Sequence, residues 1–121
     1  MSEKISFSDS ANPIDAVNVS ALNPLPVVNR IVTTATLSNV AGSATNVTVL
    51  AANANRIGAV IVNDSAAILL LKFGATASAT SFTYRLDAYS TLELPVMPLY
   101  KGIIDGIWAS ATGSARVTEY S

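Results

Sequence analysis

From Arg30 to the C-terminus, apolar and polar residues alternate in short runs that are separated by turn-forming residues. Residues 81–86 show the pattern most clearly, because Phe82, Tyr84 and Leu86 occupy every second position. Successive side chains of an extended chain point to opposite sides, so these three predict one apolar face of a β-strand. Residues 56–62 differ, because their nearly continuous apolar run predicts a strand that is covered on both sides.

The same pattern predicts about eight short strands along this part of the chain. We place them at residues 30–38, 44–50, 56–62, 68–73, 81–86, 91–94, 103–109 and 115–120. Turns are expected at 39–43 and 63–65, and the last two strands are expected to form a hairpin around 111–113.

Short strands at spacings of roughly 8–12 residues are typical of a β-sandwich or a closed barrel. No window carries apolar residues at i, i+3, i+4 and i+7 over three turns, and the many β-branched residues disfavour a helix. We therefore predict an all-β domain over residues 30–121. It should be an antiparallel β-sandwich of jelly-roll or Ig-like type.

Residues 1–29 have a different character and are predicted to form an extended N-terminal arm. Pro24 and Pro26 remove backbone donors and push the residues before them toward extended geometry. The apolar residues of the arm are isolated, which leaves two interpretations: an arm that docks on another protein surface, or a disordered tail. If the arm docks, Pro24, Leu25, Pro26 and Val27 are its candidate interface residues.

The chain carries few charges for a protein of its apolar content. Charged residues make up 12% of the 121 residues and the formal net charge is -1, against roughly 25% charged residues in an average soluble domain. This scarcity indicates a surface that faces other protein, although a solvated Ser/Thr/Asn surface would give the same composition. The seven Lys and Arg are scattered, so no nucleic acid partner is expected.

Neither a membrane segment nor a signal peptide is expected. The longest apolar run, 66–71, is far too short to cross about 30 Å of hydrocarbon, and the N-terminus lacks the apolar stretch of a signal peptide.

The sequence offers little chemistry for catalysis or metal binding. Histidine and cysteine are absent, which removes the commonest general base, the thiolate nucleophile and the usual transition-metal ligands. Asp105 near the lone Trp108 is the one pair typical of a sugar-binding site, but a simpler interpretation makes Asp105-Gly106 a bend or bulge and Trp108 a core residue. We expect no enzyme activity, no cofactor and no metal.

Four residues outside the arm are candidates for a protein interface. Tyr89 and Tyr100 fall in predicted turns or connections, and tyrosine is enriched at interfaces, whereas Tyr84 is in phase with the core. Arg56 and Arg85 are expected on the surface, where they can pair across an interface or remain solvated.

A succession of short phrases gives the C-terminal part of the chain a family resemblance. They are Asn-Ala-Asn-Arg-Ile-Gly-Ala-Val-Ile-Val-Asn-Asp-Ser (53–65), Ile-Leu-Leu-Leu-Lys-Phe-Gly (68–74), Ala-Ser-Ala-Thr-Ser-Phe-Thr-Tyr-Arg-Leu (77–86), Leu-Glu-Leu-Pro (92–95), Tyr-Lys-Gly (100–102), Ile-Asp-Gly-Ile-Trp (104–108) and Ala-Arg-Val-Thr-Glu (115–119). Their order and spacing resemble those of small virion proteins of tailed bacteriophages. The resemblance implies a structural role on a β-sandwich scaffold.

On this resemblance we expect a capsid decoration, or cement, protein at the capsid surface of the virion, made in the host cytoplasm. It would bind the major capsid protein lattice as a homo-oligomer, a trimer, with the arm reaching onto a neighbouring subunit. A tail, baseplate or fibre-attachment component is the alternative. A carbohydrate-binding module is a third possibility from another class.

Overall fold

The computed structural model describes residues 31–32 and 34–121. The predicted arm, with Pro24, Leu25, Pro26 and Val27, lies outside the described residues. The prediction of an all-β domain is confirmed: the described residues form eight strands and no helix. The strands are β1 (Ala35–Ala41), β2 (Val47–Leu50), β3 (Gly58–Asp64), β4 (Leu69–Phe73), β5 (Tyr84–Leu86), β6 (Thr91–Glu93), β7 (Ile104–Trp108) and β8 (Ser114–Tyr120).

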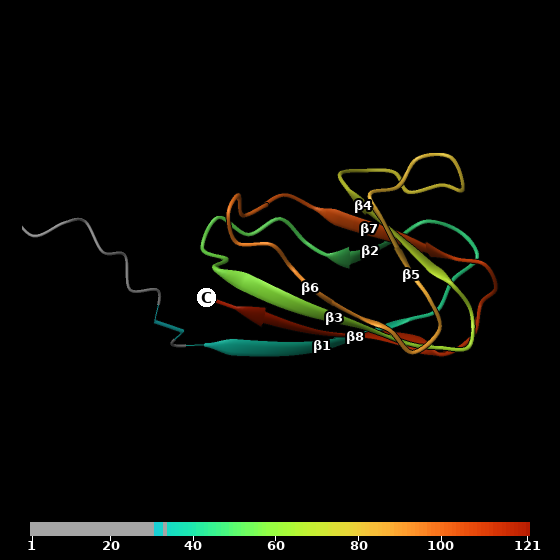
Figure 1. Ribbon diagram of the computed structural model, residues 1–121, viewed down its shortest axis with the longest axis horizontal. Coiled ribbons are helices and arrows are strands. Elements are labelled where there is room, and N and C mark those ends of the chain that lie inside the picture. The colour runs from blue at the N-terminus through green and yellow to red at the C-terminus, as the bar shows by residue number, and fades with distance from the viewer. Residues whose placement is uncertain (1–30, 33) are drawn as a thin grey trace, which may run out of the picture. The chain divides into compact units, whose positions relative to one another are not determined.

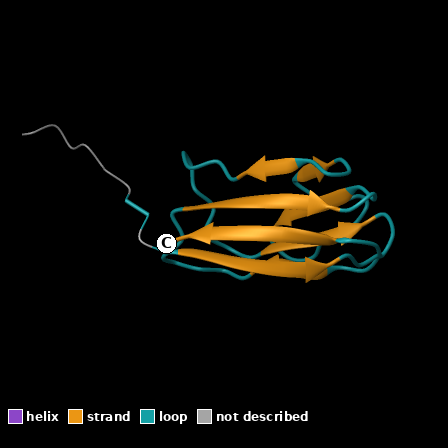
Figure 2. Cartoon of the chain, turned by 90° about the horizontal axis from the view of Figure 1, so that it is seen from below, coloured by secondary structure: helices purple, strands orange, loops and turns teal. Residues whose placement is uncertain are grey.

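The strands form two antiparallel sheets of four. The first sheet has the order β1-β8-β3-β6 and the second has the order β2-β7-β4-β5. In Figure 1, β2, β7 and β4 form one layer above β3, β8 and β1. Figure 2, seen from below, looks onto strands of the lower layer lying side by side.

One apolar core lies between the two sheets. The first sheet contributes Ala59 and Ile61 from β3 and Ala115 and Val117 from β8. The second contributes chiefly Leu69, Leu71, Ile104 and Trp108. Burying each of the large side chains stabilises the fold by roughly 1.5–3 kcal/mol, so the contact between the sheets is the main source of stability.

The strand pairs are nested around the middle of the chain. The first strand pairs with the last, β2 with β7, β3 with β6, and β4 with β5, while β3–β8 and β4–β7 contacts complete the sheets. Each sheet therefore combines strands from both halves of the chain, and most pairings are distant in sequence.

The predicted C-terminal hairpin is wrong, because β7 and β8 belong to different sheets. The connection between them crosses from one layer to the other and passes close to the end of β3. Gly113, in this connection, has a φ of 64°, which favours glycine, and a Cβ there would lie 2.5 Å from the Asp64 carbonyl oxygen. The same small residues favour a hairpin turn and a connection between two sheets, so the composition of this segment could not distinguish the two.

Several predicted boundaries also move. The turns expected at 39–43 and 63–65 begin late, because β1 continues to Ala41 and β3 to Asp64. β5 begins only at Tyr84, so Phe82 does not share the buried face of Leu86 and is 43% exposed. The irregularity predicted at Asp105-Gly106 lies on the partner strand, where the β2 register shifts between Thr48 and Leu50.

Candidate functional site

Four strands form the edges of the two sheets, and they differ greatly in length. β2 has four residues and a register shift, and β5 and β6 have three residues each. β1 has seven residues, six of which are exposed. Short or irregular edges discourage further strand pairing, so β1 is the edge most open to another strand.

The hydrogen bonds at the two ends of β1 determine which of its backbone groups face outward. Thr34 and Ser121 exchange two backbone hydrogen bonds of 2.9 and 3.0 Å, and the Gly42 amide donates to the Gly113 carbonyl over 2.9 Å. Bonded and non-bonded pairs alternate in an antiparallel ladder, so even-numbered residues of β1 bond to β8. The odd-numbered residues therefore direct their amide and carbonyl groups to the free edge: Ala35, Leu37, Asn39 and Ala41.

The β1 edge also lacks the side chains that usually protect an exposed strand. No charged residue and no proline occurs between Arg30 and Arg56. By contrast, β5 carries Arg85, and β6 carries Glu93 and is followed shortly by Pro95. Charge and proline are the common means by which natural proteins block edge-to-edge association, and β1 has neither.

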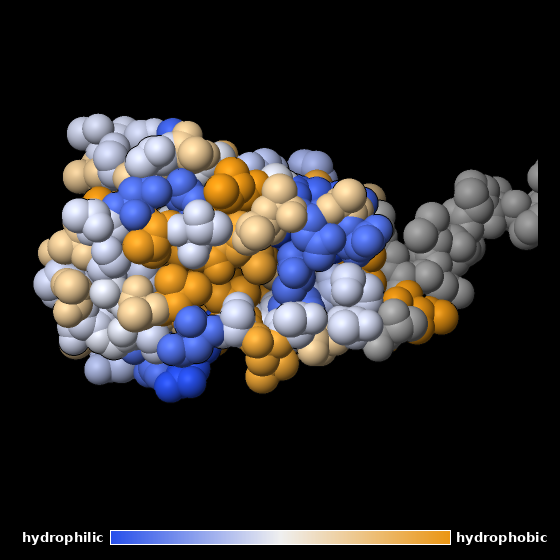
Figure 3. Space-filling model, turned by 180° about the vertical axis from the view of Figure 1, so that it is seen from behind, coloured by the Kyte–Doolittle hydropathy of each residue, from blue (hydrophilic) through white to orange (hydrophobic). Residues whose placement is uncertain are grey.

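A shallow hollow lies along β1 and β8. Its volume is about 310 Å³, and Leu37, Ser38, Asn39 and Arg116 are among its lining residues. Leu37, one of these lining residues, is 75% exposed. Figure 3, the view from behind, shows apolar side chains gathered through the middle of the molecule between hydrophilic groups.

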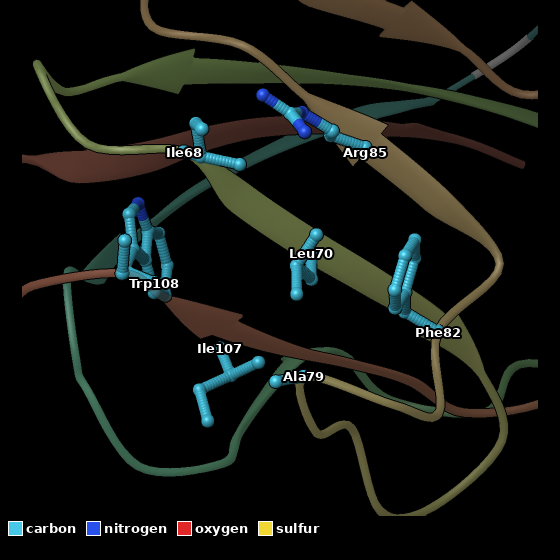
Figure 4. Close-up of a pocket in the computed structure, with 8 residues that line it drawn as sticks. Ile68, Leu70, Ala79, Phe82, Arg85, Ile107 and Trp108 are labelled. Carbon is cyan, nitrogen blue, oxygen red and sulfur yellow. The ribbon is translucent and has the colours of Figure 1, made fainter.

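A second hollow lies on the outer side of the second sheet. It has a volume of about 430 Å³, and Leu70 and Ile107 lie on neighbouring strands within it, with Phe82 to one side and Trp108 to the other (Figure 4). Arg85 supplies the one charged group among the residues that line it. Small-molecule sites normally have several convergent polar groups, so this hollow is better suited to an apolar protein side chain.

The surface position predicted for Arg56 is wrong. Its side chain is 0% exposed; its Nε donates to Glu119 Oε2 over 2.7 Å, and its terminal nitrogens donate to three backbone carbonyls. Those acceptors are the oxygens of Ala51, Tyr100 and Gly102, at 2.6, 2.9 and 3.1 Å. A guanidinium has five donors and no acceptor, so the interior accepts it only with such a set of partners. Arg56 is a structural residue and does not reach a partner surface.

The other candidates divide into exposed and half-buried residues. Arg85 is exposed and its Nε donates to Asp87 over 3.2 Å, and Tyr89 is 66% exposed, so both remain interface predictions. Tyr100 is half-buried: its ring stacks on Phe73 at 4.7 Å between centroids, and its hydroxyl donates to the Ile103 carbonyl. Much of the Tyr100 ring is therefore committed to the fold.

Sequence analysis missed the structural importance of Asn63, which it treated as a turn residue. Asn63 is 0% exposed, and its Oδ1 accepts a 3.2 Å hydrogen bond from Trp108 Nε1. Its Nδ2 donates to the carbonyls of Ala67, Leu86 and Asp87. An Asn that follows directly on a buried strand was the one available signal, and composition alone favours a turn there.

The residues with candidate chemistry are buried. Trp108 is 2% exposed, as predicted for a core residue, so its ring cannot stack on a sugar. Asp105 is also 2% exposed and accepts a hydrogen bond of 3.3 Å from Thr48. Within residues 31–32 and 34–121, no group of three acidic side chains is placed to hold a metal ion. The same residues contain no helix that could span a membrane.

Comparison of the chain with protein-family models, with curated proteins and with solved structures gave no match.

Proposed function

We propose that this chain is a non-enzymatic structural protein of a tailed-phage particle, and that it decorates the capsid. The observation that carries the proposal is the number of large apolar side chains exposed at separate places on the described surface. They are Ile31, Val32, Leu37, Phe82, Tyr89, Val96 and Met97. Exposed apolar groups on several elements suit a protein that contacts several neighbours at once.

The low charge of the chain supports the same proposal. Only 12% of its residues are charged, and none occurs between Arg30 and Arg56. A free soluble monomer relies on surface charge to stay dispersed, whereas a subunit of a shell is surrounded by protein. Many small contacts then act together through multivalency, and no single contact needs to be strong.

We further propose that the fold is a jelly roll and not an Ig-like sandwich. The nested pairing of β1 with β8, β2 with β7, β3 with β6 and β4 with β5 supports this assignment. In the Ig fold the first two strands are neighbours in one sheet, but here β1 and β2 lie in different sheets. Jelly rolls are common among viral capsid domains, although they also occur in lectins and cupins.

The proposed partner is the major capsid protein, bound at the outer surface of the virion by a homo-oligomer of this chain. A tail or baseplate protein would also need a surface that contacts several protein neighbours. The copy number per particle distinguishes that position from capsid decoration. The carbohydrate-binding alternative has lost its main candidate residue, because Trp108 is buried.

The test is the copy number of this chain relative to the major capsid protein, measured by quantitative mass spectrometry of purified particles. Decoration predicts a ratio commensurate with the shell lattice. A handful of copies per particle would overturn the capsid position in favour of the tail or baseplate. Absence from the particles would overturn the virion proposal as a whole.

A further inference from the structure

We propose that β1 is the edge through which two copies of this chain pair. The two β1 strands would run antiparallel about a twofold axis, joining the first sheets of both copies into one continuous sheet. The inference rests on three features of β1: which of its residues direct amide and carbonyl groups to the free edge, the type of its side chains, and its exposure. It does not depend on a role in the virion.

The backbone groups of β1 are self-complementary in this arrangement. With the axis at Ser38, Ala35 lies opposite Ala41 and Leu37 lies opposite Asn39 of the second copy. These four residues are the ones whose amide and carbonyl groups face outward, so every outward donor meets an outward acceptor. A shift of the axis by half a residue would place outward groups opposite inward ones, so the phase restricts the register.

The side chains of β1 fit the same register. Leu37, 75% exposed in the single chain, becomes a diagonal neighbour of the second copy's Leu37, within reach of apolar contact. Thr36 lies opposite Val40, and Ser38 meets its own copy at the axis. No charged side chain occurs on either strand, so the pairing brings no like charges together.

The fold also leaves room for a second copy at this edge. Thr36 and Ser38 are on the side of the sheet that faces the core, because Ser38 is the register partner of the buried Val117. Both are nevertheless exposed, since they lie at the open side of the molecule. The hollow along β1 and β8 lies on the opposite, outer side of the sheet, where Leu37 and Asn39 line it. The other edges are short, charged or irregular, so β1 alone offers a long match.

A twofold contact between the β1 strands uses this edge of both copies, so it produces a dimer and leaves no β1 edge for a third copy. The proposal therefore predicts a dimer of the free chain, in place of the trimer expected from the family resemblance. Any threefold arrangement on a capsid would have to use other surfaces.

Cross-linking tests the register directly, because the chain has no cysteine of its own. In the full chain, Ser38→Cys places two thiols at a non-hydrogen-bonded pair, where Cα atoms lie about 4.5 Å apart, within the span of a disulfide. Thr36→Cys is the matched control, since the two residues 36 are four positions out of register, about 13 Å apart. Mild oxidation and non-reducing gel electrophoresis should give a covalent dimer with Ser38→Cys and monomer with Thr36→Cys.

A second pair of variants tests whether the edge holds the dimer together. Leu37→Lys places two ammonium groups near each other across the axis, whereas Met97→Lys changes a residue that is 91% exposed and lies away from β1. Light scattering after size exclusion should give twice the chain mass for the unmodified protein and for Met97→Lys. It should give the mass of one chain for Leu37→Lys, with an unchanged circular dichroism spectrum.

Three results would overturn the proposal: a full chain that is monomeric at micromolar concentration, a trimer, or equal cross-linking at positions 36 and 38. None of these results bears on the copy number in particles. The proposed β1 pairing and the proposed virion role are therefore tested independently.

Discussion

Strand β3 has a buried polar side chain near each of its ends, and the two differ in charge. Arg56 lies two residues before the strand and Asn63 is its penultimate residue; both are 0% exposed. Each gathers one carbonyl group from a nearby loop and two from loops that are distant in sequence. The Arg56 end carries a full positive charge balanced by Glu119, whereas the Asn63 end is neutral and includes the Trp108 indole.

The comparison shows two ways of fixing loops around a small β core. The charged end forms stronger hydrogen bonds, but it must overcome the cost of removing two ions from water. The neutral end forms weaker bonds at a smaller desolvation cost. Removing the central side chain should therefore be more damaging at the charged end, where a partly buried carboxylate would remain without its partner.

The largest effect is expected from Arg56→Met. Glu119, whose side chain is 15% exposed, would lose its cation, and three carbonyls would lose their donor. Breaking a buried ion pair from one side typically costs about 3–5 kcal/mol. Urea unfolding followed by Trp108 fluorescence should show this loss in the free energy of unfolding.

Arg116→Met is the matched control for that experiment. Arg116 donates to Asp64 over 2.8 Å, but the two side chains are 64% and 41% exposed. Exposed pairs contribute about 0–1 kcal/mol, so the loss should stay below about 1 kcal/mol. Equal losses in the two variants would show that the burial of Arg56 does not increase its contribution to the free energy of unfolding.

Asn63→Leu is expected to cost less, about 2–3 kcal/mol. Leucine fills a similar volume but leaves the Trp108 N–H and buried carbonyls without partners, at roughly 1–3 kcal/mol for each group that stays unsatisfied. Unfolding followed by circular dichroism measures the loss, and the Trp108 indole proton should exchange faster with solvent. Asn55→Leu, at an exposed position, should change stability by no more than about 0.5 kcal/mol. A loss larger than that of Arg56→Met would reverse the order of the two ends.

Among the variants of these two buried residues, the smallest effect, about 1–2 kcal/mol, is expected from Arg56→Lys. Lysine keeps the charge beside Glu119 but has three donors on a point charge instead of a planar fork, so one or two of the hydrogen bonds are lost. The same unfolding experiment separates charge from geometry. If Arg56→Lys were as unstable as Arg56→Met, the hydrogen-bonding geometry of the guanidinium, and not its charge, would account for the stability contributed at this end.

The strands themselves were largely predictable from the sequence. Alternating apolar residues correspond to buried and exposed sides, and the apolar run at 56–62 falls on β3, where Ala59 and Ile61 enter the core. Local periodicity is sufficient here, because each side chain's burial depends mainly on which face of its strand it occupies.

The two polar centres were not predictable, because their partners are far away along the chain. Arg56 and Glu119 are 63 residues apart, and Trp108 and Asn63 are 45 residues apart. Composition rules assign arginine to the surface and an Asn-Asp-Ser sequence to a turn. Only the fold brings the acceptors together. The exposed candidates Arg85 and Tyr89 were placed correctly on the surface, since nothing distant competes for their side chains.

The position of β8 has a consequence for how the protein forms during synthesis. β8 is the last of the eight strands to leave the ribosome, yet it lies between β1 and β3 in the middle of the first sheet. Until its residues emerge, β1 lacks its partner within the sheet, because Ala35 and Thr36 pair with Tyr120 and Glu119. The first sheet therefore cannot form until residues 114–120 have been made. Pairing over such separations is slow, on the order of milliseconds to seconds, and the uncharged β1 segment stays exposed for that time.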